Sequence, residues 1–249
     1  DYQNINKLAF ETLSRAGYCI NNQTLIKHIH QLSSGTIMDS LGNITKYFEY
    51  LPNKQINFSF KDLDNCLNDI FSNYKKFLKK GSKIYLSLSA GKDSRLIAAK
   101  LKEHNFSNVI CYSYGAKHSN DYKISKQVAK KFNFKHHFIE INKKKSFEIF
   151  KSKLRDDYWN DFFNINCLPN MQDFYALYIL KEKKILQGKN NYFINGQTAD
   201  FLTGAHLLNE KKPNELIKKF YLKNFTLLNQ SKINSDIIKI LQKDYLKIS

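Results

Sequence analysis

From Gly81 onward, short apolar runs alternate with longer segments in which apolar residues recur every three or four positions. The short runs predict buried strands at Ile84–Ser89, Val109–Tyr114, His136–Ile141 and Tyr192–Asn195. The longer segments predict helices at Ser94–His104, Asp121–Phe134 and Met171–Leu186. Strands that alternate with helices are joined by right-handed crossovers, so the pattern predicts an α/β fold with a parallel, doubly wound sheet.

The pattern before Gly81 is different. Residues 24–52 contain short β-like pieces between turn signals, which predict a hairpin. Ser59 then begins a helix with Asp62 three residues later, as in a capping box. The apolar face expected for this helix carries Leu63, Leu67, Ile70, Tyr74 and Phe77, and Lys79, Lys80 and Gly81 are expected to end it.

Composition narrows the class of protein. The 249 residues are 42% hydrophobic, enough for a packed core, but no apolar run is long enough for a membrane span. The four cysteines are widely spaced, which favours neither a zinc site nor a disulfide framework and is typical of the reducing cytoplasm. The net charge of +18 raises the question of nucleic acid, but arginine occurs only at Arg15, Arg95 and Arg155. Because arginine is the preferred residue for phosphate and base recognition, this scarcity argues against a nucleic-acid partner.

The strongest candidate site is the turn after the first predicted strand, Ser-Ala-Gly-Lys-Asp-Ser. It does not fit a Walker loop, because Leu86 stands in place of the first glycine and Asp93 in place of the serine or threonine after Lys92. It does not fit a dinucleotide fingerprint either, because Gly91 is the lone glycine of the turn. It fits the pyrophosphate loop S-G-G-x-D-S at Ser89, Gly91, Asp93 and Ser94, with Ala90 in place of the first glycine. The turn also lies at the carboxyl end of a parallel strand, where ligands bind in such sheets. The competing interpretation is a tight turn without a ligand, since serine and aspartate are ordinary helix caps.

The residue types in the turn suit phosphate. Small residues let backbone N–H groups face an anion, and the following helix directs its positive end to the same place. Asp93 would repel phosphate by itself, so its presence indicates a bridging Mg²⁺. Lys92 either contacts phosphate or points to solvent, and the sequence favours neither.

Three other segments resemble the asparagine synthetase family. The segment 111–141, with its His-His pair, resembles the second strand, helix and third strand of the synthetase domain. The segment I-N-G-Q-T-A-D-F-L-T-G-A-H, residues 194–206, resembles the family's G-x-x-A-D-E-L-F-G-G segment. Residues 24–50 resemble the tail of the glutaminase domain that precedes the synthetase domain in the family. The resemblance implies a remnant of a glutaminase-like domain and linker over 1–58 and a PP-loop ATP pyrophosphatase domain over 59–249.

The resemblance also implies an activity and its residues. The domain would adenylate a carboxylate (aspartate or a sugar carboxylate), release pyrophosphate and transfer the acyl group to ammonia or an amine, with ATP and Mg²⁺ as cofactors. Asp93 and Asp200 would hold Mg²⁺, and Asp93, Asp200 and Gln197 would be the catalytic residues. The residues implied to bind ATP are Leu88, Ser89, Ala90, Gly91, Lys92, Ser94, Tyr114, Asn195 and Gly196.

The sequence departs from the family in several places. Gln197 stands where the family usually has an acid, and an amide cannot take a proton at neutral pH. Phe201 replaces the next acid, and the family's downstream catalytic lysine has no recognisable match. Because the sequence begins at Asp1, we expect it to be a piece of a longer protein, without the N-terminal cysteine of a glutaminase and incomplete at its C-terminal end.

Two other functions stay open on these residues. Basicity suggests a tRNA-modifying PP-loop enzyme, although no C-x-x-C motif supports a thiolation enzyme. Gln197 and the unmatched lysine suggest an ATP-binding module without turnover. His136 and His137 are predicted to be structural, Asp121 is predicted to lie in the first turn of its helix, and the oligomeric state is left open.

Overall fold

The computed structural model describes residues 2–49, 57, 59–197, 237, 239, 240 and 243. The chain divides into two compact units. The first comprises Asp1–Gln55, Asp156–Pro169 and His206–Ser249, and the second comprises Ile56–Arg155 and Asn170–Ala205. The division falls within helix α6 (Lys153–Phe162), and the boundary expected between residues 58 and 59 stays a prediction.

The first unit is built on a short 3-10 helix η1 (Tyr2–Asn4), helix α1 (Lys7–Ala16) and strands β1 (Thr36–Met38) and β2 (Ile44–Lys46). The side chain of Asn6 caps α1 by accepting the N–H groups of Leu8 and Ala9, at 3.2 Å each. Strands β1 and β2 pair antiparallel, so the predicted hairpin is present.

The segment 164–168 belongs to this unit through backbone pairing. Cys19 and Leu25 donate their N–H groups to the carbonyls of Asn166 and Ile165, both at 2.7 Å. Leu168 donates in turn to Gly17 at 2.7 Å. These bonds satisfy the backbone of two irregular segments that have no helix or sheet of their own.

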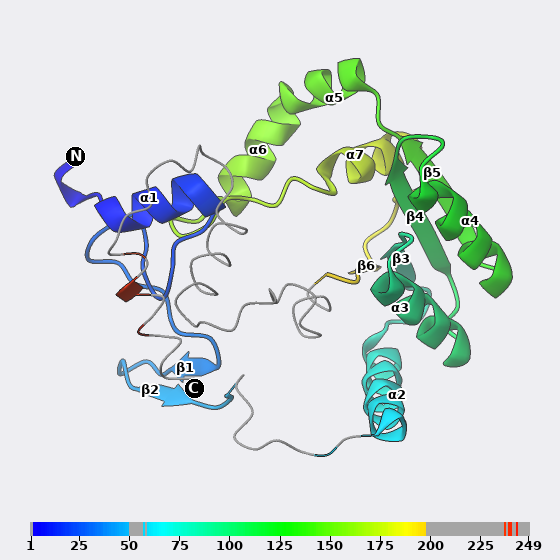
Figure 1. Cartoon of the computed structure of the whole chain (residues 1–249), viewed down its shortest axis with the longest axis horizontal. Coiled ribbons are helices and arrows are strands. Elements are labelled where there is room, and N and C mark those ends of the chain that lie inside the picture. The colour runs from blue at the N-terminus through cyan, green and yellow to red at the C-terminus, as the bar shows by residue number, and fades with distance from the viewer. Residues whose placement is uncertain are drawn as a thin grey trace. The chain divides into compact units, whose positions relative to one another are not determined.

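The second unit is an α/β unit around a four-stranded sheet. Its elements are α2 (Phe60–Phe77), β3 (Lys83–Ser87), α3 (Lys92–Glu103), β4 (Val109–Gly115), α4 (Asn120–Phe132), β5 (Lys135–Glu140), α5 (Lys143–Phe150), α7 (Phe174–Glu182) and β6 (Asn191–Ile194). The strand order is β5-β4-β3-β6, and every neighbouring pair is parallel (Figure 1). The chain therefore builds outward from β3 to β5 and then returns to the other side of β3. This change of direction is the topological switch point at which such sheets bind ligands.

Helices cover both faces of the sheet, as the doubly wound prediction requires. Leu86 packs on one face in a buried cluster with Ala98 and Leu101 of α3, and Ala129 of α4 belongs to the same cluster. On the opposite face, neighbouring Tyr85 packs in a second cluster that includes residues of α5 and α7. Each fully buried side chain of this kind contributes about 2 kcal/mol relative to an exposed one.

Helix α2 begins as predicted. The Ser59 hydroxyl accepts the N–H of Asp62 at 3.2 Å, and the Asp62 carboxylate accepts the N–H of Ser59 at 2.9 Å. The helix ends at Phe77, before the three residues that were expected to end it. The ends of two other helices also differ from the prediction by a few residues. Helix α3 starts at Lys92 instead of Ser94, and α7 is shorter than the predicted helix 171–186.

The apolar face expected for α2 is mostly exposed, and of its five residues only Leu67 is partly buried. Leu63, Ile70, Tyr74 and Phe77 are exposed, and the buried residue of the helix is Phe71. Phe71 contacts Phe106 edge to face, with ring centroids 6.3 Å apart. The spacing of the apolar residues was correct, but α2 meets the rest of its unit through a neighbouring face.

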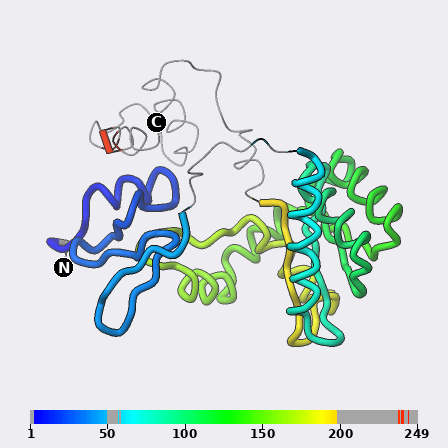
Figure 2. Tube along the Cα trace, turned by 90° about the horizontal axis from the view of Figure 1, so that it is seen from below, coloured from blue at the N-terminus to red at the C-terminus, as the bar shows by residue number. Residues whose placement is uncertain are grey.

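Tyr74 and Phe77 of α2 line a cavity of about 470 Å³ together with β6 residues Tyr192, Phe193 and Ile194. The tubes of α2 and β6 run beside each other in Figure 2. No helix among the described residues has both the length and the apolar character needed to cross a membrane.

Candidate active site

The candidate phosphate turn connects β3 to α3. Strand β3 ends at Ser87, and the N-cap of α3 is Gly91, which offers no side-chain cap. The first N–H groups of an α-helix have no partner within the helix, so an uncapped start is available to an anion. The helix therefore begins two residues before the predicted Ser94, inside the motif itself.

Serine hydroxyls hold the turn in shape. The buried hydroxyl of Ser94 accepts the N–H of Ser89 at 3.1 Å, and the two serine hydroxyls lie 3.1 Å apart. The Ser89 hydroxyl accepts the N–H of Gly91 at 3.1 Å. The two serines thus link the end of β3 to the first turn of α3.

One contact in the turn comes from a distant element. Ala90 donates its N–H to the carboxylate of Asp121 at 2.8 Å. Asp121 lies in the first turn of α4, as predicted, but no sequence pattern indicates this contact across 31 positions.

The end of β6 closes against the same turn. A β-carbon at Gly196 would lie 2.9 Å from the backbone nitrogen of Ser94 and 3.0 Å from the β-carbon of Asp93. Only glycine allows this approach without a shift of the backbone. Asn195 accepts the N–H of Gln197 at 3.2 Å, which shapes the chain just beyond the strand.

A cavity of about 430 Å³ lies at this edge of the sheet. It is lined by Ser87, Leu88, Ser89, Gly91, Asp93, Ser94, Ser113, Tyr114, Asp121, Asn170, Gln172, Asp173, Asn195, Gly196 and Gln197. Most of the predicted site residues are thus brought together. Ala90 and Lys92 belong to the turn but do not line the cavity, Lys92 is exposed, and Asp200 lies outside the described residues.

Sequence reasoning missed the residues that reach this cavity from other segments. Asn170, Gln172 and Asp173 come from the loop before α7, and Ser113 comes from β4. They carry no motif of their own. The usable signal was topological, because Ser113 and Tyr114 lie near the carboxyl end of a strand beside β3.

The described lining of this cavity is acidic. Asp93, Asp121 and Asp173 contribute carboxylates, and no lysine, arginine or histidine is among the described lining residues. A polyphosphate would meet like charge here unless a cation accompanied it. The carboxylate and hydroxyl oxygens of the turn are the donors that Mg²⁺ prefers, so the residues present fit a metal-bound phosphate chain. Within the described part of the chain, no three His, Cys, Asp or Glu side chains lie close enough together to hold a metal ion by themselves.

Two tyrosines on β4 stay protonated in this environment. Burial raises the pKa of Tyr112 and of Tyr114, and the carboxylate of Asp173 raises both further. The Tyr112 hydroxyl donates to Asp173 at 3.4 Å. Tyr114, which lines the cavity, therefore keeps its hydroxyl proton beside the Asp173 carboxylate.

His136 contacts a serine of β4 that lines the cavity. The Nε2 atom of His136 lies 2.9 Å from the hydroxyl of Ser113, which also accepts from Ser125 at 3.1 Å. Burial lowers the pKa of His136, and His137 and Lys126 lower it further. His136 is therefore part of a neutral hydrogen-bond network behind the cavity wall, in agreement with a structural role.

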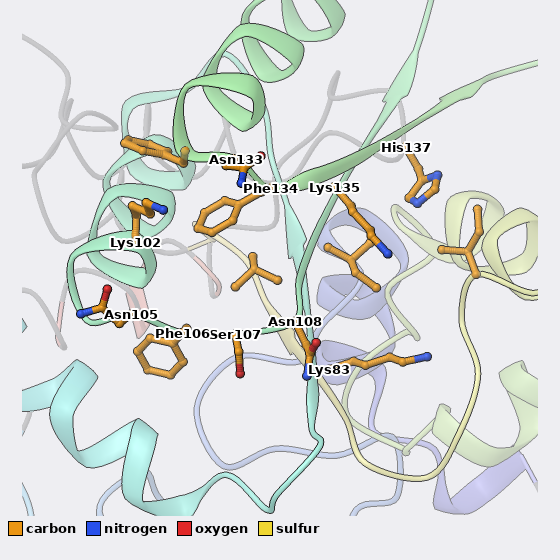
Figure 3. Close-up of a pocket in the computed structure, with 14 residues that line it drawn as sticks. Lys83, Lys102, Asn105, Phe106, Ser107, Asn108, Asn133, Phe134, Lys135 and His137 are labelled. Carbon is orange, nitrogen blue, oxygen red and sulfur yellow. The ribbon is translucent and has the colours of Figure 1, made fainter.

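A larger cavity, of about 670 Å³, lies at the opposite edge of the sheet (Figure 3). It is lined by Lys83, Lys102 and Lys135, with His137 beside them. The helices α3 and α4 end at this edge, and exposed carbonyls at helix C-termini favour cations in their last turn. Lys102 is explained by the end of α3, whereas Lys83 and Lys135 begin strands β3 and β5. None of the predicted site residues lines this cavity, so its size alone does not make it the site.

The order of the parallel strands and the turn after β3 define the class of the domain: an α/β domain of the PP-loop ATP pyrophosphatase type. Residues 75–165 match the model of the asparagine synthase family, and they make up less than half of the chain. The chain therefore contains an asparagine synthetase-like PP-loop domain, the kind found in ATP-utilising enzymes. Comparison with curated proteins gives no significant match.

Several solved structures are similar at a low level. The NH₃-dependent NAD synthetase from Campylobacter jejuni is 18% identical, with a TM-score of 0.41, over 77% of this chain and 87% of that one. NMN synthetase from Francisella tularensis is also 18% identical, with a TM-score of 0.37 and the same coverage of 77% and 87%. The U34-tRNA thiolase NcsA from Methanococcus maripaludis is 15% identical, with a TM-score of 0.34, over 78% and 67%. At these values the fold assignment rests on the sheet and the family match.

Proposed function

We propose that this chain carries the ATP pyrophosphatase site of an Mg-ATP-dependent amide-forming ligase. The enzyme activates a carboxylate as an acyl-adenylate and transfers the acyl group to ammonia or an amine. The observation that carries the proposal is the phosphate turn: an uncapped helix start after β3, at the switch point of the sheet, with Gly196 packed against it.

The reaction begins with attack of a carboxylate oxygen on the α-phosphorus of ATP. The bond from this phosphorus to the oxygen that bridges to the β-phosphorus breaks, and pyrophosphate leaves. Attack by nitrogen on the acyl carbon then releases AMP and a proton. The negative charge that develops on pyrophosphate would be stabilised by the N–H groups at the start of α3 and by the hydroxyls of Ser89 and Ser94.

Asp93 is the proposed metal residue within the described cavity, and Asp200 is its proposed partner. When bound, Mg²⁺ would neutralise charge on the phosphate chain. Tyr114, Asn195 and Gly196 are proposed to lie against the nucleoside, since they lie on strands or strand ends on both sides of β3. Gln197 would bind substrate by hydrogen bonds and not act as a base. Aspartate and sugar carboxylates are the proposed acceptors.

The test is pyrophosphate release from Mg-ATP with a panel of carboxylates and an ammonium donor. Asp93→Ala should lower the rate at least about a hundredfold, because it removes charge stabilisation of the leaving group. Asp69→Ala is the matched control, since Asp69 is exposed on α2 and does not line the cavity. If no carboxylate gives release that depends on Asp93, the ligase proposal is wrong.

Gln197, which is unsuited to act as a general base, supports one other candidate function, an ATP-binding module without turnover. Gln197 lines the cavity but cannot accept a proton at neutral pH. Calorimetric binding of Mg-ATP without pyrophosphate release under any of these conditions would favour this candidate over the ligase.

A further inference from the structure

Every backbone N–H from Ser89 to Gly91 donates to a side chain. Ser89 donates to the Ser94 hydroxyl, and Gly91 donates to the Ser89 hydroxyl. Ala90 donates to Asp121 at 2.8 Å, the shortest of the three distances. The acceptor of Ala90 differs from the other two, because it is charged and comes from outside the turn.

Asp121 is not required as the cap of its own helix. Ser119 is the N-cap of α4, and its hydroxyl accepts the N–H of Tyr122 at 3.2 Å. Asp121 forms no ion pair with any other described residue, although the chain carries a net charge of +18. Its carboxylate is instead directed to the Ala90 N–H and lines the cavity that holds Asp93 and Ser94.

A carboxylate oxygen resembles a phosphate oxygen in charge and in its preference for backbone N–H groups. We propose that Asp121 is a resident anion of the phosphate turn, a residue that sets its specificity. Without ligand it binds the Ala90 N–H, and a phosphate oxygen takes over that N–H when nucleotide or pyrophosphate binds. This inference rests on the proposed function, since it assumes that the turn receives a phosphate chain.

Asp121 has a second effect once a phosphate oxygen has displaced its carboxylate from the Ala90 N–H. The released carboxylate stays on the wall of the same acidic cavity, where it repels a phosphate chain that carries no metal. A metal-bound chain carries less negative charge and meets less repulsion. Asp121 therefore makes the turn select metal-bound over metal-free phosphate chains.

Two variants separate these effects from a structural role. Asp121→Asn keeps an oxygen acceptor of similar size but removes the charge, and Asp121→Ala frees the Ala90 N–H altogether. Both should bind metal-free pyrophosphate about tenfold more tightly than the wild type, the scale of one charge-assisted hydrogen bond. The gain should be smaller for magnesium pyrophosphate, so the preference for the metal-bound ligand falls.

The experiment is calorimetric titration of the full chain with pyrophosphate, in EDTA and in excess MgCl₂. Asp69→Asn is the control, because it makes the same change in net charge at an exposed position of α2 outside the cavity. The expected result is tighter metal-free binding by both Asp121 variants, with Asp69→Asn indistinguishable from the wild type. Circular dichroism establishes that each variant is folded.

Equal or weaker metal-free binding by folded Asp121 variants would overturn the inference and leave the ligase proposal intact. Loss of the fold in both variants would also overturn it, since Asp121 would then be a structural anchor. If no protein bound pyrophosphate under either condition, the phosphate turn and this inference would both be wrong. Tighter metal-free binding without any pyrophosphate release from ATP would support the inference while the ligase proposal failed.

Discussion

Gly196 lies so close to the start of α3 that a β-carbon there would be 2.9 Å from the backbone nitrogen of Ser94. The two residues are far apart in sequence, but Gly196 follows β6 and Ser94 lies in the helix that follows β3, and these two strands pair in parallel. The relationship ties the shape of the phosphate turn to the end of β6.

Gly196→Ala should therefore disturb both stability and binding. The new methyl group would contact backbone, which cannot move aside cheaply, so we expect a loss of about 1–3 kcal/mol in the free energy of unfolding. Mg-ATP binding should weaken as well, because the first N–H groups of α3 shift. Urea unfolding and calorimetry measure the two effects.

Gly91→Ala is the comparison. Its φ of −61° is accessible to alanine, and the new β-carbon would meet only the hydroxyl of Ser89, at 3.1 Å. We expect a smaller loss of stability than for Gly196→Ala. A larger loss at Gly91 would show that the contact between β6 and α3 is not the tight point of the site.

At Lys100 we expect the packing of the side chain to contribute more to the free energy of unfolding than its ion pairs do. Its side chain is buried, and its ammonium group lies 2.6 Å from Asp64 and 2.9 Å from Glu103. Asp64, and then Glu103, raise the pKa of Lys100, so it stays charged at neutral pH. Because both carboxylates are more than half exposed, they can be rehydrated when the lysine is removed.

Most of the loss in Lys100→Ala should therefore come from the buried methylene groups, about 2–3 kcal/mol in the free energy of unfolding. Lys100→Met, which keeps most of the stem, should lose clearly less. Lys102→Ala, at an exposed position of the same helix, is the control in urea unfolding. Equal losses in the methionine and alanine variants would show that the ion pairs dominate.

His136 predicts a dependence of stability on pH. Its pKa is lowered below 6.5 in the folded protein, chiefly by burial, so the folded state binds fewer protons than the unfolded state in that window. The stability from neutral His136 is thus fully present above pH 6.5 and is lost as pH falls through the lowered pKa. Burial also lowers the pKa of His137, which adds a contribution of the same sign.

Urea unfolding on both sides of pH 6.5 measures this loss. His136→Gln should reduce the dependence on pH in this window, although the variant itself is less stable because the contact with Ser113 changes. His118→Gln, at an exposed position, is the matched control. An unchanged dependence on pH in His136→Gln would contradict the assignment of His136 as a buried neutral residue.

The parts of the fold that depend on local pattern were predictable. Strands β3, β4, β5 and β6 and the turn after β3 follow from runs of apolar residues and from a compact motif. Which residues of α2 are buried was not predictable, because an exposed apolar face and a buried one have the same spacing. The structure orients α2 by the contacts of Phe71 with Phe106 and of Asp64 with Lys100, which depend on elements later in the chain.

The candidate site also has features that were predictable from the sequence and features that were not. The cavity positions of Ser89, Asp93 and Ser94 follow from the motif and the direction of β3. The contact between Ala90 and Asp121 joins two strand-to-helix connections, so no local signal marks it. The motif also could not show which side chains face the cavity, and Lys92 is directed to solvent instead.

The most direct test of the central claim is isotope exchange between labelled pyrophosphate and Mg-ATP in the presence of the carboxylate substrate. Reversible adenylation predicts carboxylate-dependent incorporation of label into ATP, which Asp93→Ala abolishes and Asp69→Ala leaves unchanged. If ATP is instead cleaved to ADP and phosphate, or if exchange persists in Asp93→Ala, the turn after β3 is not the pyrophosphate site that we propose.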